Sequence, residues 1–157
     1  MFGFLKKRAF RSEVQTDLTY LLGFGLNDDV LQELLRAYPG IWKAVDADFA
    51  TGETAMTSAI KFLAIAFTNV IEHRIPASDY SRVERYLLHN EGEPKFRVER
   101  GIKAFLAQLL VQKDLGRVAD ELYNYTIFEI FGAIRGIPSN ERMARRLVAP
   151  LLQPSTE

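Results

Sequence analysis

Residues 53–74 read ETAMTSAIKFLAIAFTNVIEHR and form the longest segment with helical periodicity in the chain. The apolar residues recur at helical spacing and cover most of the circumference of the expected helix. Because such a helix must be covered by several neighbours, the segment predicts a long central apolar helix over about 53–74. Its most apolar stretch, Phe62 to Ile71, is ten residues long, shorter than the ~20 residues that span a bilayer.

One sector of this helix is polar. A helical projection places Thr57, Lys61, Thr68 and Glu72 in that sector, with Lys61 as its cation and Glu72 as its anion. Hydroxyl groups beside a fixed charge suit a small anionic ligand or an acidic side chain of a partner. The sector is therefore a candidate ligand or partner groove, although a solvent-exposed stripe would give the same pattern.

The segments on either side are also helical. Apolar residues at helical spacing are separated by proline, glycine and capping residues, and no sustained strand-like alternation occurs. Ser12 and Gln15 form a capping-box pattern for the first helix, and Ser139 or Asn140 caps the last one. We expect the apolar residues of that last helix to face inward: Met143, Leu147 and Val148. The prediction is an all-α, single compact bundle of six to eight helices.

The chain of 157 residues has the length of one ordinary domain. We predict a basic and aromatic N-terminal tail over 1–11, a single helical domain over 12–153 and a loose C-terminal tail over 154–157. Gly101 and Gly132 fall inside expected helices, where glycine is unfavourable, so we expect a close helix crossing at each.

Charge and cysteine content exclude several functions. Twenty basic and twenty acidic residues leave no net charge, so we expect no general nucleic-acid binding. The absence of cysteine excludes disulfides, thiolate metal sites and cysteine nucleophiles. Neither a secretory signal nor a lipid-anchor motif is recognisable, which favours a cytoplasmic location.

The N-terminal tail combines four cations with large apolar residues and contains no acid. Such a segment can place aromatic rings at a lipid headgroup boundary while its cations meet anionic lipid. The candidate membrane or partner contacts are Phe2, Phe4, Leu5, Lys6, Lys7 and Arg8. Because residues 12–53 carry eight acids and two bases, folding of the tail back onto its own domain is the alternative.

Basic residues also gather near the C-terminus. The candidate patch for phosphate or an acidic partner consists of Arg135, Arg142, Arg145 and Arg146. Glu141 lies within the same segment and dilutes its positive charge. A solvated helix face is the alternative interpretation of this cluster.

The two histidines, His73 and His89, lack metal-binding spacing, and we expect no metal or cofactor. Arg82 and His89 are separated by six residues, a spacing similar to the Arg-x(4–6)-His motif of helical ribonucleases of the HEPN class. That resemblance implies a phosphate clamp and a general base acting on RNA. Chance readily produces this spacing among so many arginines, and Val83 stands where the family usually has a polar residue, so we assign no family.

These observations favour a non-enzymatic, cytoplasmic protein-binding module of adaptor, inhibitor, immunity or chaperone-like type, because no catalytic constellation exceeds chance. One alternative is a small helical enzyme or ligand-binding bundle with a pocket near the central helix and Tyr123, Tyr125 and Phe128. Another is a peripheral membrane protein that docks weakly on anionic lipid through residues 2–11. The expected partner is another protein, and the oligomeric state stays open.

Overall fold

The computed structural model describes residues 2–89 and 96–152, with the side chains of Phe2 and of residues 148–152 left aside. Within these ranges the chain forms eight α-helices and one short 3₁₀ turn, and it contains no strand. The elements are α1 (Phe2–Leu21), α2 (Asp28–Ala37), α3 (Ile41–Ala50), α4 (Ala55–Arg74), η1 (Ala77–Asp79), α5 (Tyr80–His89), α6 (Arg97–Asp114), α7 (Asp120–Ile134) and α8 (Ser139–Leu152). The predicted all-α bundle is confirmed, whereas the predicted tail over 154–157 lies outside the described residues.

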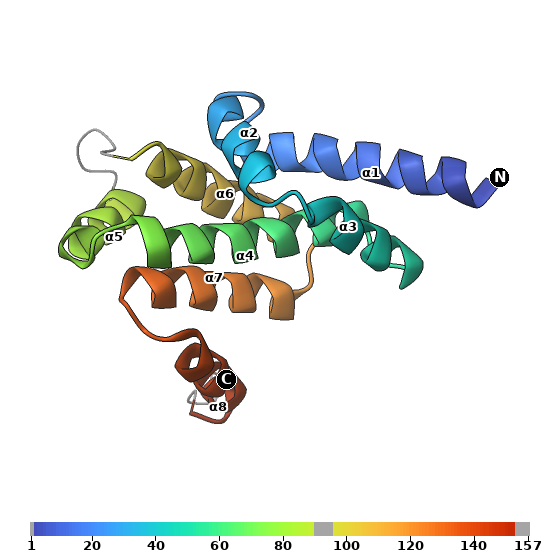
Figure 1. The fold of residues 1–157 in the computed structure, drawn as a ribbon. Helices are drawn as coiled ribbons and strands as arrows, with labels where there is room; N and C mark the ends of the chain where they lie inside the picture. The colour runs from blue at the N-terminus through green and yellow to red at the C-terminus, as the bar shows by residue number, and fades with distance from the viewer. Residues whose placement is uncertain (1, 90–95, 153–157) are drawn as a thin grey trace.

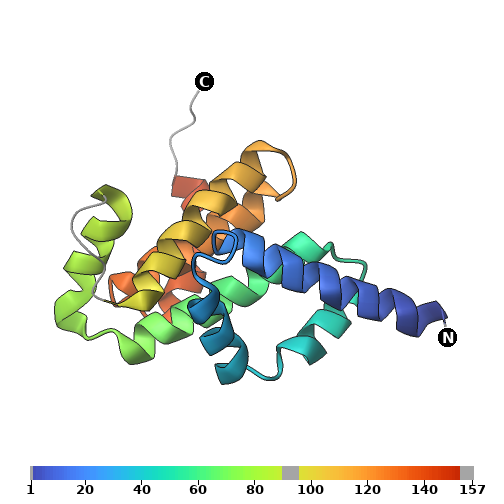
Figure 2. The ribbon, with the colours of Figure 1, turned by 90° about the horizontal axis from the view of Figure 1, so that it is seen from above.

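Helix α4 lies at the centre, and α1, α3, α6 and α7 pack around it. Figures 1 and 2 show α1 crossing one side of α4, and Figure 1 shows α7 running alongside the other. Ile60, Leu63 and Phe67 are completely buried in this arrangement. Thr54 caps the helix, since its Oγ1 accepts a hydrogen bond from the Thr57 amide at 3.1 Å. The central apolar helix is therefore confirmed.

By length and composition α4 also qualifies as a helix that could cross a membrane, which the ten-residue apolar stretch did not predict. Within the part of the chain that the structure describes, it alone qualifies. The other helices bury 61% of its most apolar window. Because the core helix of a soluble protein passes the same test, its central position in the bundle accounts for this property.

Helix α1 begins earlier than the capping-box pattern at Ser12 predicts. It starts at Phe2, so residues 2–11 form a helix that continues into the domain and not a separate tail. Ser12 lies inside this helix, where its carbonyl accepts a hydrogen bond from the Thr16 hydroxyl at 3.1 Å. The first turns of α1 project beyond the bundle (Figures 1 and 2).

The two glycines inside helices have different roles. A Cβ atom on Gly101 would lie 2.9 Å from a methyl group of Val30 and 3.4 Å from the Phe67 ring, so this glycine allows the close helix contact that we expected. A Cβ atom on Gly132 would overlap the side chain of Arg142. Gly132 therefore makes room for a buried arginine side chain of α8, whereas the sequence predicts a close helix crossing there.

We expect Gly132→Ala to lower the free energy of unfolding by about 3 kcal/mol, as measured by urea denaturation. The added methyl group overlaps the Arg142 side chain, which cannot move without breaking its buried ion pairs. Gly3→Ala is the control, because nothing lies within 4 Å of the new Cβ atom. That control leaves stability unchanged or raises it slightly. Equal stability of the two variants would contradict the position of Arg142.

Candidate functional site

Helix α3 occupies the N-terminal part of the polar face of α4. The Lys61 Nζ lies 2.9 Å from Asp48 Oδ1, and the Ser58 hydroxyl donates to Asp48 Oδ2 at 2.8 Å. The Thr57 hydroxyl accepts a hydrogen bond from the Thr54 hydroxyl at 3.0 Å. Of the predicted groove residues, Lys61 therefore joins α3 to α4, and Thr57 takes part in the cap of α4.

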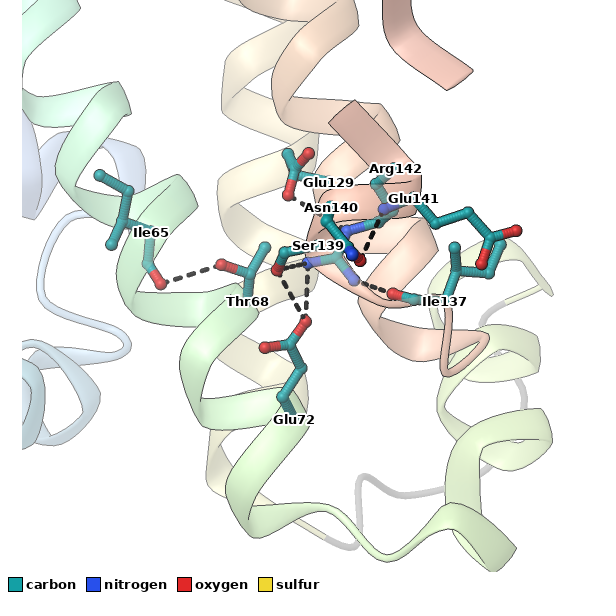
Figure 3. A network of polar contacts seen from close by, with 9 residues as sticks. All are labelled: Ile65, Thr68, Glu72, Glu129, Ile137, Ser139, Asn140, Glu141 and Arg142. Carbon is teal, nitrogen blue, oxygen red and sulfur yellow. Dashed lines mark hydrogen bonds and ion pairs between the residues drawn. The ribbon is translucent and has the colours of Figure 1, made fainter. Parts of the chain in front are cut away.

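Helix α8 occupies the C-terminal part of the same face. The Thr68 hydroxyl donates to the Ile65 carbonyl at 3.0 Å, a bond within α4. Glu72 Oε1 accepts hydrogen bonds from Arg142 Nη2 at 2.7 Å and from the Ser139 hydroxyl at 3.3 Å (Figure 3). The polar groups of the predicted groove therefore bind neighbouring parts of this chain, while the side chains of Lys61 and Glu72 stay 42% and 33% exposed.

Arg142 is the centre of a buried polar network and has no exposed surface. Its Nε donates to Glu129 Oε2 of α7 at 3.1 Å, and its Nη2 donates to Glu72 of α4 and to the Ser139 hydroxyl at 2.8 Å. Its Nη1 donates to the Ile137 carbonyl (Figure 3). A buried charge is tolerated only when it is paired and hydrogen-bonded, and every guanidinium nitrogen here has an acceptor. One side chain thus joins α4, α7 and α8.

The four C-terminal arginines do not form one free patch. Arg142 is buried, which is contrary to its predicted access to phosphate or an acidic partner. Arg135 pairs with a glutamate of α5 at 2.9 Å, and Arg145 pairs with a glutamate of its own helix at 2.8 Å. The Arg146 guanidinium lies 4.4 Å from the centre of the Tyr125 ring. Burial raises the pKa of that tyrosine, and a neighbouring glutamate raises it further.

The N-terminal half of α1 is attached to α3 on one side. Arg11 donates to both carboxylate oxygens of Asp46, with an Nε–Oδ1 distance of 2.7 Å. Lys7 approaches the same carboxylate at 3.8 Å. The rings of Phe10 and Phe49 lie 5.3 Å apart. These contacts explain why the helix extends past Ser12 toward the N-terminus.

The other side of this segment is exposed. Phe4 and Leu5 are 64% and 56% exposed, and Lys6 and Arg8 are exposed beside them. Neither cation forms an ion pair with a residue that the structure describes. The side chain of Phe2, the remaining predicted contact, lies outside the description. A cationic and apolar surface therefore faces solvent at the end of α1.

Arg82, the arginine of the ribonuclease-like spacing, contacts residues at the start of α6. Its Nη2 pairs with the completely buried Glu99 of α6, and its guanidinium lies 5.5 Å from the centre of the Phe96 ring. His89 is exposed in the last turn of α5. Over residues 2–89 and 96–152, no three His, Asp or Glu side chains are grouped so that they could hold a metal ion.

Helix α8 turns apolar residues outward. Met143 and Leu147 are 52% and 70% exposed, which corrects the expectation that they face the core. Arg142 and Arg146, one helical turn apart, take the side that packs against α7. Because each apolar residue follows one of these arginines directly, it is rotated by about 100° from that side. Val148, also expected inward, lies outside the described side chains.

A cleft of about 330 Å³ lies between α2, α4 and α6. Val70 and Arg74 from the end of α4 line it, so it is separate from the network around Arg142. None of the residues expected near a pocket, Tyr123, Tyr125 and Phe128, is among those that line this cleft.

Comparison with known proteins adds no candidate function. No protein-family model matches the chain, and neither a curated protein nor a solved structure matches it. The functional interpretation therefore depends on the geometry of the side chains.

We expect Arg142→Met to lower the free energy of unfolding by about 3–5 kcal/mol, because it leaves the buried Glu129 without its cation. Addition of Glu129→Gln removes that charge and restores part of the loss, which a double-mutant cycle in urea measures. Arg145→Met, at an exposed pair, serves as the control and costs about 0.5 kcal/mol or less. If the effects of the two substitutions on the free energy of unfolding were additive, the ion pair between Arg142 and Glu129 would be contradicted.

The attachment of α1 to α3 depends on pH. Hydrogen bonding to Arg11 lowers the pKa of Asp46 below its ordinary value. The stabilisation is therefore present above the unfolded-state pKa of about 3.9 and is lost as the pH falls through the folded-state pKa. Urea denaturation at pH 7 is expected to show Asp46→Asn as less stable than the native chain. The difference in free energy of unfolding between this variant and the native chain is expected to shrink in strong acid. An unchanged difference would contradict the ion pair between Asp46 and Arg11.

Proposed function

We propose that this chain is a non-enzymatic, cytoplasmic protein-binding module and that α8 is its docking helix. The orientation of α8 carries the proposal, because Arg142 faces inward while Met143 and Leu147 face solvent. An amphipathic helix in a bundle ordinarily buries its apolar stripe. An exposed stripe is typical of a helix that enters an apolar groove on another protein.

The charges around this stripe favour a protein groove over lipid or nucleic acid. Glu141 and Arg145 form an ion pair at 2.8 Å, so their charges cancel. Arg142 is buried and paired within the chain, so its charge does not face a partner. Arg146 lies over the Tyr125 ring. Arg146 is therefore the one exposed cation on the described part of α8 without an acidic partner among the described residues, and a single positive charge attracts phosphate backbones or anionic headgroups only weakly. The identity of the partner decides whether the chain acts as an adaptor, an inhibitor, an immunity protein or a chaperone-like factor.

We expect a benzophenone amino acid at Leu147 to cross-link a discrete partner protein in native cell extract. The same group at Leu26, which is 81% exposed in the turn before α2, is the control for non-specific capture. Equal capture at both positions would count against α8 as the docking helix. A cross-link only to a second copy of the chain would replace the proposal with self-association.

The captured partner is then purified for calorimetry with the full-length chain. The double variant Met143→Ser/Leu147→Ser is expected to weaken binding by about 100-fold or more, because two apolar side chains at about 1.5–3 kcal/mol each leave the interface. Leu26→Ser leaves the affinity unchanged. An unchanged affinity of the double variant would refute the proposed interface.

A second candidate function is attachment to anionic membranes. The exposed apolar and cationic residues at the N-terminal end of α1 favour it. Phe4 and Leu5 are exposed there beside Lys6 and Arg8, neither of which pairs with an acid among the described residues, and the first turns of the helix project from the bundle (Figure 2). Apolar side chains can enter the headgroup boundary while each cation near the surface contributes about 1 kcal/mol. This surface is cationic where that of α8 is nearly neutral, so the two suit different partners.

Sedimentation with phosphatidylserine vesicles tests this second function. We expect the native chain to sediment and Lys6→Glu/Arg8→Glu to lose at least about 30-fold in partitioning, since two cations are removed. Arg36→Glu/Lys43→Glu changes the overall charge equally at exposed sites on α2 and α3 and is the control. Equal losses in both variants would indicate a general charge effect and would reject α1 as the membrane contact.

A further inference from the structure

The cleft between α2, α4 and α6 has an apolar floor. Its volume of about 330 Å³ falls within the range of small-molecule sites. Val30, Leu34, Val70 and Ile75 line it, and none of them is more than 5% exposed. These side chains come from two segments distant in the sequence, α2 and the end of α4, and provide a surface for an apolar ligand group.

Charged side chains lie among the lining residues. Arg74 and Arg97 come from α4 and α6, and Glu33 comes from α2. Arg74 pairs with Glu33, while Arg97 is 70% exposed and reaches Asp29 only at 3.4 Å. A guanidinium has five N–H donors, so both arginines retain donors for a further acceptor. The lining therefore carries two positive charges and one negative charge.

We propose that this cleft binds an organic monocarboxylate with a short unbranched apolar chain. The chain covers the apolar floor, and the carboxylate bonds to Arg74 and Arg97, since the guanidinium fork matches a carboxylate. A second carboxylate on the ligand would meet Glu33, and a cationic head group would meet two guanidinium groups. The lining charges thus select a single negative charge. This site is independent of the docking surfaces on α8 and α1.

Calorimetric titration of the full-length chain with hexanoate and octanoate tests the apolar floor. Each buried methylene strengthens binding about four-fold, so octanoate is expected to bind about 15-fold more tightly than hexanoate. Octanol and octylamine carry the same chain without the carboxylate and are expected to bind at least about 10-fold more weakly than octanoate. Absent octanoate binding, or equal affinity for octanol, overturns the proposal.

Methyl NMR locates the ligand. Octanoate is expected to shift the methyl signals of Val30 and Val70, whereas shifts confined to Leu26 and Leu147 would place it on exposed apolar residues elsewhere and overturn the proposal. Val98→Trp places a larger side chain at the edge of the cleft and is expected to weaken octanoate binding at least about 10-fold with the fold retained. Unchanged binding to this folded variant contradicts the site.

Two arginine variants test the head group. Arg74→Gln/Arg97→Gln is expected to bind octanoate and octanol equally while it keeps the dependence on chain length. Arg8→Gln/Arg36→Gln removes two exposed arginines outside the cleft and is expected to keep the full preference for octanoate. A preference that survives in the first variant, or disappears in the second, shows that these two guanidinium groups do not select the ligand.

Discussion

Helix α4 is apolar around most of its circumference, and no single neighbour can cover such a surface. Four helices pack around it, and each needs only one apolar stripe of its own to take part. Removal of this large apolar surface from water is the main favourable term that holds the bundle together. The positions of α1, α3, α6 and α7 all follow from that requirement.

The polar sector of α4 is the part that apolar packing cannot cover. Near the beginning of α4, Asp48 of α3 accepts hydrogen bonds from Lys61 and Ser58. Near the end of α4, Arg142 of α8 donates a hydrogen bond to Glu72. Ion pairs and hydrogen bonds thus attach α3 and α8 where apolar contacts are missing. The stripe that suggested a ligand groove also joins α4 to α3 and α8.

Arg142 also determines which surface the protein presents. Glu72, Glu129 and the space above Gly132 form a slot that a guanidinium fills and an apolar side chain would leave with uncompensated charges. Insertion of the arginine turns Met143 and Leu147 toward solvent. The last helix is consequently held by its charged side and offers its apolar side to other molecules. The N-terminal end of α1 differs, because its exposed apolar residues lie beside cations that have no acidic partner in the described part of the chain.

The helical class and the central position of residues 55–74 could be predicted from the sequence, because helical periodicity is a local property of neighbouring residues. The start of α1 could not, since the pattern at Ser12 resembles a true cap and only contacts of Phe10 and Arg11 with α3 extend the helix. The orientation of α8 depends on Arg142 and Glu72, which are 70 residues apart. The position of Gly132 inside a helix indicated a close contact there. The sequence could not distinguish contact with a neighbouring helix from contact with the side chain of an arginine. Local spacing determined which segments are helices, whereas long-range pairing of charges, visible only in the tertiary structure, decided which sides of them are buried.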